Sequence, residues 1–261
     1  MKVVLITGAA AGLGRALAKR YFDAGHRLVL ADLDEQKLKD LERELDAPDR
    51  VLTQSMDVTD TDAIAELVDA TRDAFGQLDI LINNAGITHR SPAHRTDTAV
   101  FKKVMAVDWQ APIELTLSCL DLLRESKGQI VNIGSMAGWM PLPGRAAYGA
   151  AKSALTQFFE VLRMELEDDA VDVLMVYPSF LKTDIEANAL GHDGQAAGHA
   201  QSRVGKQRDA DWMAERIVKA AEKRKRWLFP DRLSKIGSLL WRISPSLYLK
   251  LIRRKFEGDL R

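Results

Sequence analysis

Short apolar segments alternate with longer amphipathic segments along most of the chain. The apolar segments are rich in Val, Leu and Ile, are bounded by turn residues and show no polar alternation, which predicts strands covered on both faces. We expect seven such strands, at residues 3–7, 27–31, 51–56, 80–83, 129–133, 171–176 and 227–229.

Segments with helical periodicity lie between these strands. They occupy residues 14–24, 35–45, 61–75, 99–123, 147–167 and 211–223. Strands and helices in alternation are typical of βαβ units with a parallel sheet, and no linker interrupts them. The sequence therefore predicts an α/β fold, a doubly wound parallel sheet flanked by helices, in a single domain of residues 1–230.

Two segments depart from this alternation. Residues at about 184–210 become polar and small, which indicates a surface loop after the sixth strand. Residues 231–261 form a basic amphipathic extension with apolar side chains at three- and four-residue spacing, at Leu233, Ile236, Leu240 and Ile243. We expect Pro245 to end this first amphipathic piece, and a second basic piece follows it.

Composition excludes some classes of protein. With 46% hydrophobic and 28% charged residues the chain is neither disordered nor fibrous. Thirty-seven basic residues balance thirty-seven acidic ones, which argues against nucleic-acid binding over the whole surface. The balance is uneven, however, because residues 219–261 carry a formal charge of +9 and the preceding residues −9.

The single cysteine, Cys119, lies in an apolar run and is expected to be a buried small residue. One cysteine forms no intramolecular disulfide, which favours a reducing compartment. The apolar start of the chain is too short for a signal peptide, and the longest uncharged stretch, residues 128–144, is too short to span a membrane. We expect a cytoplasmic protein, with peripheral membrane contact as an alternative.

A glycine-rich turn connects the first strand to the first helix. Gly8 suits a tight turn, Gly12 allows a diphosphate to approach the backbone, and Gly14 allows the helix to pack closely on the strand. The free amides of the helix start favour an anion. A preceding strand and a following helix make this motif more specific than three glycines alone.

Asp32 ends the second strand, eighteen residues after Gly14. A carboxylate there can accept hydrogen bonds from both hydroxyls of an adenosine ribose and repels a 2′-phosphate. Neither Ala11 nor Leu33 offers a compensating cation, so the sequence predicts NAD rather than NADP. The alternative is that Asp32 is only a helix cap.

Ser135 follows the fifth strand, and Tyr148 and Lys152 lie four residues apart in the next helical segment. That spacing places the phenol and the ammonium on one helix face. A nearby ammonium favours the phenolate and moves its titration toward physiological pH, while Ser135 can hydrogen-bond a substrate oxygen. Taken alone, this spacing is more often that of surface residues.

The joint pattern resembles the short-chain dehydrogenase/reductase family, in its short single-domain branch with a Rossmann-like fold. The resemblance rests on TGAAAGLG at residues 7–14, Asp57-Val58, NNAG at 83–86, Ser135, Tyr148 with Lys152, and Pro178 with Thr183. It implies a dinucleotide-binding catalytic domain and reversible hydride transfer between an alcohol and NAD.

The resemblance also implies roles for individual residues. Tyr148 would exchange the substrate proton, Ser135 would hold the oxygen, and Lys152 would lower the tyrosine pKa and bind the nicotinamide ribose. The implied cofactor-binding residues are Thr7, Gly8, Gly12, Leu13, Gly14, Asp32, Asp57, Val58, Asn84, Ala85, Gly86, Tyr148, Lys152, Pro178 and Thr183.

Two positions depart from the family pattern. Asp108 stands where the family usually has an asparagine, and a carboxylate there would stabilise the Lys152 ammonium and weaken its effect on Tyr148. We take Asp108 as a further catalytic-site residue, with a purely structural role as the alternative. Ser179 replaces the usual glycine after Pro178, which bears on the geometry around the nicotinamide.

Large apolar side chains flank Ser135 and Thr183, which favours an apolar secondary alcohol or ketone as substrate, although ordinary core positions are the alternative. These side chains are Trp139, Met140, Leu142, Phe180 and Leu181. The five histidines show no spacing that suits a metal, so we expect none, and His192 and His199 are expected to be exposed loop residues.

The remaining expectations concern partners. The fourth and fifth helices resemble those through which the family forms a homodimer or homotetramer. The basic extension could cover the substrate cleft, pack on a partner subunit or contact a membrane. KRKR at 223–226 lacks interleaved aromatics, so no nucleic-acid partner is expected. Two alternative functions are a 3-oxoacyl-carrier reductase and a non-catalytic dinucleotide-binding sensor or scaffold.

Overall fold

A seven-stranded sheet forms the centre of the computed structural model, which describes residues 1–198 and 205–257. Its strands are β1 (Val3–Thr7), β2 (Arg27–Asp32), β3 (Val51–Ser55), β4 (Ile80–Asn83), β5 (Gln129–Ile133), β6 (Asp172–Val176) and β9 (Trp227–Leu228). They lie in the order β3-β2-β1-β4-β5-β6-β9, and all neighbours are parallel. The predicted doubly wound fold is confirmed, and each strand ends within one residue of its predicted bounds.

The chain order reverses at β1, which pairs with β2 on one side and with β4 on the other. In sheets of this kind a crevice opens beyond the carboxyl ends of the strands at the reversal. Thr7 and Asn83 end these two strands, so the glycine turn and residues 84–86 both enter this crevice.

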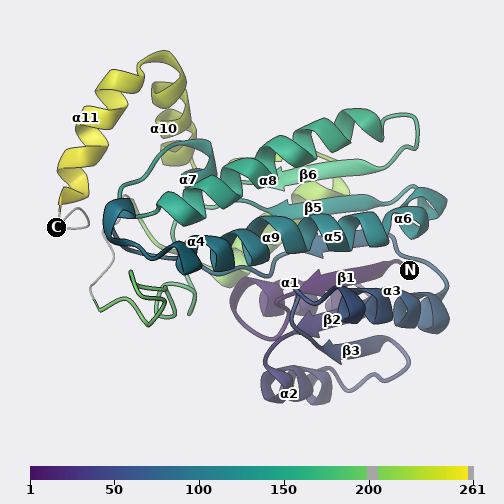
Figure 1. Ribbon diagram of the computed structural model, residues 1–261. Coiled ribbons are helices and arrows are strands. Elements are labelled where there is room, and N and C mark those ends of the chain that lie inside the picture. The colour runs from purple at the N-terminus through teal and green to yellow at the C-terminus, as the bar shows by residue number, and fades with distance from the viewer. Residues whose placement is uncertain (199–204, 258–261) are drawn as a thin grey trace.

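Helices cover both faces of the sheet (Figure 1). One face carries α1 (Gly12–Asp23), α2 (Glu35–Leu45) and α9 (Ala210–Glu222); the other carries α3 (Thr61–Phe75), α5 (Ala111–Ser118) and α8 (Ala146–Glu165). Successive β1 residues point to opposite faces of the sheet. Val4 and Ile6 pack on the side of α1, α2 and α9, and Val3 and Leu5 pack on the side of α3, α5 and α8. This two-sided burial explains why the strands show no polar alternation.

The helix predicted at 99–123 is wrong as a single element. It is divided into α4 (Thr98–Met105), a π-helical turn η2 (Ala106–Gln110), α5, and α6 (Leu120–Ser126). Pro112 lies in the first turn of α5 and offers no amide to the preceding carbonyls, which favours the wider turn. Asp108, which lies in that turn, is fully buried.

Several short elements were not predicted. They are the 3₁₀ turn η1 (Ala93–Arg95), the single-turn helix α7 (Met136–Trp139), and a two-stranded sheet of β7 (Leu181–Lys182) and β8 (Arg208–Asp209). Parallel pairing of β7 with β8 closes the base of the predicted loop at about 184–210. Residues 199–204 of that loop, including His199, lie outside the described residues, as do residues 258–261 of the extension.

Two helices follow the sheet, α10 (Arg232–Ile243) and α11 (Pro245–Lys255). Pro245 is the first residue of α11, a position where its missing amide has no helical partner to lose. Figure 1 shows this hairpin at one end of the molecule, next to α7. Within the described ranges, no helix combines the length and the apolar character needed to cross a bilayer.

Candidate active site

The glycine turn brings the start of α1 against the carboxyl ends of β1 and β4. Gly8 and Gly12 have φ angles of +62° and +50°, in the left-handed region that favours glycine. A Cβ on Gly14 would lie 1.9 Å from the carbonyl oxygen of Gly8, so any larger residue there would displace the turn. The turn therefore depends on glycine at Gly8 and Gly12 for the backbone conformation and at Gly14 for space.

The start of α1 is built to receive an anion. Its N-cap residue, Ala11, provides no side-chain hydrogen bond, and no acidic residue occupies the first turn. The first amides of the helix point into the pocket that Gly8, Gly12 and Leu13 line. The close approach of backbone and the uncapped helix start fit a dinucleotide diphosphate.

Asp32 is held at the end of β2 beside this turn. Its Oδ2 accepts a hydrogen bond from the Ala10 amide at 2.8 Å, and its Oδ1 accepts one from the Asp34 amide at 2.9 Å. The N-cap of α2 is Asp34, which accepts from the Lys37 amide, so Asp32 is not needed as that cap. Lys37 pairs with Asp34 at 2.9 Å.

Thr7 and Asn84 lock the two strand ends together. The Thr7 hydroxyl accepts hydrogen bonds from the amides of Asn84 and Ala85 at 3.1 and 3.0 Å. The Asn84 side chain donates to the carbonyl oxygens of Thr7 and Gly8 at 2.9 and 3.0 Å. Asn84 thus supports the glycine turn as well as lining the pocket.

The same pocket extends from the end of β2 to the C-terminal helices. Asp57 and Val58 line it beyond β3, with the Asp57 carboxylate accepting hydrogen bonds from the amide and hydroxyl of Thr59. Pro178 and Thr183 line it beyond β6, and the Thr183 methyl lies opposite Gly12. The Ser179 hydroxyl donates to Asp231 at 2.8 Å, which ties this turn to the start of the C-terminal hairpin.

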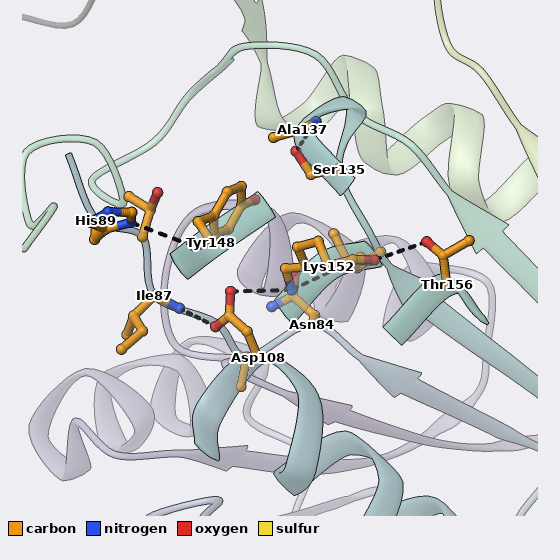
Figure 2. Close-up of polar contacts among 12 residues, drawn as sticks. Asn84, Ile87, His89, Asp108, Ser135, Ala137, Tyr148, Lys152 and Thr156 are labelled. Carbon is orange, nitrogen blue, oxygen red and sulfur yellow. Dashed lines mark hydrogen bonds and ion pairs between the residues drawn. The ribbon is translucent and has the colours of Figure 1, made fainter. Parts of the chain in front are cut away.

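Tyr148 and Ser135 line this pocket, and Lys152 lies beside them (Figure 2). Tyr148 and Lys152 come from successive turns of α8, and the Lys152 Nζ lies 5.9 Å from the centre of the Tyr148 ring. The buried Lys152 ammonium donates to the Ile133 carbonyl oxygen at 3.1 Å. Ser135 caps α7 by accepting a hydrogen bond from the Ala137 amide at 3.1 Å.

Asp108 reaches the same point from the π-helical turn (Figure 2). Its Oδ1 accepts a hydrogen bond from the Ile87 amide at 2.8 Å, and its Oδ2 lies 3.6 Å from the Lys152 Nζ. Burial raises the pKa of the Asp108 carboxyl, while Lys152 and the Ile87 amide oppose that rise. The carboxylate therefore acts both as a support for the 84–91 segment and as the partner of Lys152.

The surroundings of Tyr148 favour its protonated form. Burial raises the pKa of the Tyr148 phenol most, and the Asp108 charge raises it further. Hydrogen bonding to Ser135 and the charge of Arg145 lower the pKa, while Glu186 raises it. The net effect raises the pKa of the Tyr148 phenol above its ordinary value.

A buried charge cluster beside Tyr148 was missed by sequence reasoning. Arg145 donates to the Thr88 hydroxyl at 2.9 Å, to the His89 carbonyl oxygen at 3.1 Å and to Glu186 at 2.9 Å. Arg90 lies 3.5 Å from the same Glu186 carboxylate. These residues fix the loop at about 184–210 to the segment after β4, and only their positions in the fold bring them together.

Apolar side chains form the end of the pocket nearest the C-terminal hairpin. Met140, Leu142, Phe180 and Leu181 line it as expected, and Tyr248 and Ile252 of α11 join them. Trp139 does not line the pocket; its ring packs against Tyr177 and Phe229 in the second core layer. Trp139 is therefore a core residue and not part of the pocket wall.

Other candidate residues lie outside this site. Cys119 is buried, and burial raises the pKa of its thiol to about 12. In the KRKR segment, Arg224 donates to the Lys127 carbonyl oxygen and pairs with Asp172, which is a structural role. Across the described ranges, no three His, Cys, Asp or Glu side chains gather in a group that could bind a metal.

Comparison with known proteins agrees with this architecture. A family model described as short chain dehydrogenase matches residues 2–193. The chain is 33% identical over 259 residues to Dehydrogenase/reductase SDR family member 7B of Xenopus laevis, covering 96% of this chain and 80% of that protein. It is 35% identical over 198 residues to 11-beta-hydroxysteroid dehydrogenase A of Sesamum indicum, covering 74% of this chain and 56% of that protein.

A solved structure shows the same fold with a nucleotide bound. The short-chain dehydrogenase/reductase of Burkholderia phymatum in complex with NAD superposes with a TM-score of 0.83, at 26% identity and with 94% of each chain covered. The matching family model, the relatives and the order of the strands lead to one conclusion. The chain belongs to the short-chain dehydrogenase/reductase family.

Proposed function

We propose that this protein is an NAD(H)-dependent oxidoreductase that interconverts an apolar secondary alcohol and a ketone. Its family consists of oxidoreductases that use a nicotinamide dinucleotide. The observation that carries the proposal is that Tyr148 lines the pocket that begins at the glycine turn, with the Lys152 Nζ 5.9 Å from the centre of its ring. A proton-transfer group and a dinucleotide cradle therefore face one space.

The chain's own residues account for binding and proton transfer. The glycine turn and the start of α1 would hold the diphosphate, Asp32 would bind the adenosine ribose, and Lys152 would bind the nicotinamide ribose. The bound dinucleotide would supply hydride transfer to or from the substrate carbon, and Pro178 and Thr183 line the pocket that would hold it. In reduction, Tyr148 donates its proton to the carbonyl oxygen, which Ser135 holds by a hydrogen bond; in oxidation, the phenolate takes the hydroxyl proton.

NAD is the proposed cofactor because of Asp32. Its carboxylate is fixed by two backbone amides at the end of β2, where a 2′-phosphate would meet its negative charge. The neighbouring cation Lys37 is paired with Asp34. The bound NAD in the Burkholderia phymatum structure is consistent with this assignment.

An apolar substrate is proposed from the pocket and from one relative. Met140, Leu142, Phe180 and Tyr248 form the pocket end beyond Ser135, and an alcohol with hydrocarbon on both sides of its carbon would fit among them. The relative from Sesamum indicum is named for a hydroxysteroid, which is an apolar secondary alcohol.

The test is a panel of secondary alcohols and ketones with each nicotinamide cofactor, read by the absorbance of the reduced nicotinamide. Tyr148→Phe should lower kcat about 10²–10⁴-fold while changing the Kd for NAD little, because the ring is kept and only the proton donor is lost. Tyr21→Phe removes another buried hydroxyl, outside the pocket, and is the matched control.

Near-normal turnover by Tyr148→Phe would contradict the proposed role of Tyr148. Activity only on 3-oxoacyl thioesters, added to the panel, would instead favour the carrier-linked reductase. NAD binding with no turnover on any substrate class would favour a sensor.

A further inference from the structure

The C-terminal hairpin of α10 and α11 exposes an apolar stripe on each helix. Ile236, Leu239 and Ile243 lie at helical spacing on α10, and Leu247 and Leu251 lie four residues apart on α11. Each of these five side chains is between 47% and 73% exposed. Ile243 and Leu247 flank the short turn between the helices, and we call these five residues the hairpin stripe.

Leu249 of α11 is exposed as well, and the other large exposed apolar residues of the described surface lie outside the hairpin, at Met1, Leu33, Leu117, Val161, Met164 and Trp227. The hairpin stripe is therefore a local concentration rather than the usual single exposures. Contiguous apolar surface of this kind marks an interaction site.

Basic side chains surround the stripe. Residues 232–257 contain seven Lys or Arg and one acid, Glu257, and all seven basic residues are exposed. Lys235 adjoins the α10 stripe, and Lys250 and Arg254 adjoin the α11 stripe at three- and four-residue spacing. The Arg242 guanidinium instead lies over the Trp139 ring, 4.6 Å from its centre. An exposed face that combines apolar and basic residues is complementary to anionic lipid headgroups and the acyl region beneath them.

The opposite side of the hairpin is firmly attached to the molecule. Tyr248, Ile252 and Phe256 are buried in a cluster with Met140, Leu142 and Phe180, and the Tyr248 hydroxyl donates to the Pro141 carbonyl oxygen at 2.9 Å. A Cβ on Gly237 would lie 3.2 Å from the Met140 side chain. The hairpin thus has an inner face that lines the pocket and an outer face whose apolar side chains are exposed among the described residues.

We propose that this outer face docks on an anionic lipid membrane. The apolar stripe enters the headgroup region, and the surrounding Lys and Arg side chains bind lipid phosphates. A second copy of the chain fits less well, because pairing two hairpins face to face would bring two strongly basic surfaces together. Docking places the mouth of the pocket at the lipid surface, where an apolar substrate is dissolved; this last step alone rests on the proposed function.

The test is sedimentation of the full-length protein with vesicles. We expect binding to vesicles of phosphatidylcholine mixed with phosphatidylglycerol, little binding to phosphatidylcholine alone, and release by salt, since screening weakens the electrostatic part. Arg253→Gln with Arg254→Gln should weaken binding by roughly twenty-five-fold, at about fivefold for each charge. Ile243→Gln with Leu247→Gln should also release the protein.

Matched controls keep charge and exposure comparable. Lys39→Gln with Arg43→Gln removes two exposed charges from α2, and Leu33→Gln removes an exposed apolar residue that follows β2. Both controls should bind vesicles as the unmodified chain does. All of the substituted residues are exposed, so a thermal melt should confirm that each variant is folded.

Three results would overturn the proposal. The first is the absence of sedimentation with the anionic vesicles at low salt. The second is an equal loss of binding in the hairpin pairs and the controls. The third is a hairpin pair that converts a dimer into a monomer without changing vesicle binding, which would assign the face to a second copy.

A separate measurement tests delivery of the substrate. For a long-chain ketone dissolved in vesicles, kcat/KM should fall in the hairpin variants, while turnover of a short water-soluble ketone should not change. Equal turnover of the vesicle-bound ketone by the hairpin variants would overturn the delivery step. Inactivity toward every ketone would contradict the proposed function and leave the vesicle result to decide the docking.

Discussion

Asp108 is the residue whose charge most alters the chemistry expected of this site. An asparagine in its place would accept the same hydrogen bond from the Ile87 amide but carry no charge. The carboxylate instead pairs with Lys152 at 3.6 Å and raises the pKa of the Tyr148 phenol. Proton donation to a ketone is thereby favoured at neutral pH over proton removal from an alcohol.

Asp108→Asn should therefore move alcohol oxidation to lower pH. Oxidation requires the phenolate, so its rate rises with pH through the Tyr148 pKa, and loss of the neighbouring negative charge lowers that pKa. We expect the midpoint of kcat/KM against pH to fall by about one unit, a typical effect for one nearby charge.

The other charged groups near Tyr148, which are Lys152, Arg145 and Glu186, are unchanged in Asp108→Asn. Asp69→Asn on the exposed side of α3 is the control and should leave the pH profile as it is. A midpoint that stays in place or rises in Asp108→Asn would show that the carboxylate does not act on the phenol.

We expect the Asp32 side chain to determine the preference for NAD over NADP. Asp32→Ala should weaken NAD far more than NADP, because the ribose hydroxyls lose their acceptor while the repulsion of a 2′-phosphate is removed. The measurement is the Kd of each cofactor by fluorescence titration, and we expect the NAD preference to fall at least tenfold. A chain that prefers NADP before substitution would contradict the assignment.

At the scale of elements, the glycine turn was predictable because each glycine answers a local backbone requirement. The π-helical turn was not predictable, because residues 99–123 have helical periodicity throughout. Pro112 was the available signal, yet proline is also normal in the first turn of a helix. The wide turn matters because it carries Asp108 into the site.

Gly14→Ala should damage cofactor binding by steric collision. The added Cβ would lie 1.9 Å from the Gly8 carbonyl oxygen, so α1 and the turn must separate. We expect the Kd for NAD to rise at least tenfold and Tm to fall by several degrees.

Gly25→Ala provides the contrast, because Gly25 has a φ of +82° but open space around its missing Cβ. It should lower the free energy of unfolding by about 1 kcal/mol and leave NAD binding unchanged. Equal effects of the two substitutions on NAD binding would argue against a steric role of Gly14.

At the scale of the whole molecule, α5 and α8 lie side by side over one face of the sheet (Figure 1). Leu117 on α5 and Met164 on α8 are at least half exposed, and Val161 lies one turn before Met164. We propose that copies of the chain associate through these helices, which leaves the C-terminal hairpin free.

Light scattering after gel filtration should then give a mass that is twice or four times 29.0 kDa. Leu117→Arg with Met164→Arg should yield monomers, because two charges would be buried unpaired in the interface. Ile243→Arg, in the hairpin stripe, should leave the mass unchanged. A monomeric unmodified chain would contradict the proposal.

The sequence alone determined the parallel sheet, the cofactor turn and the positions of Tyr148 and Lys152, because these features depend on local periodicity and on residues close together in the chain. The tertiary structure decided the rest. Asp108 reaches Lys152, and Arg145 reaches Glu186, across separations of tens of residues. It also divided the apolar residues of the C-terminal extension between pocket wall and exposed stripe, since burial depends on which neighbours the fold supplies.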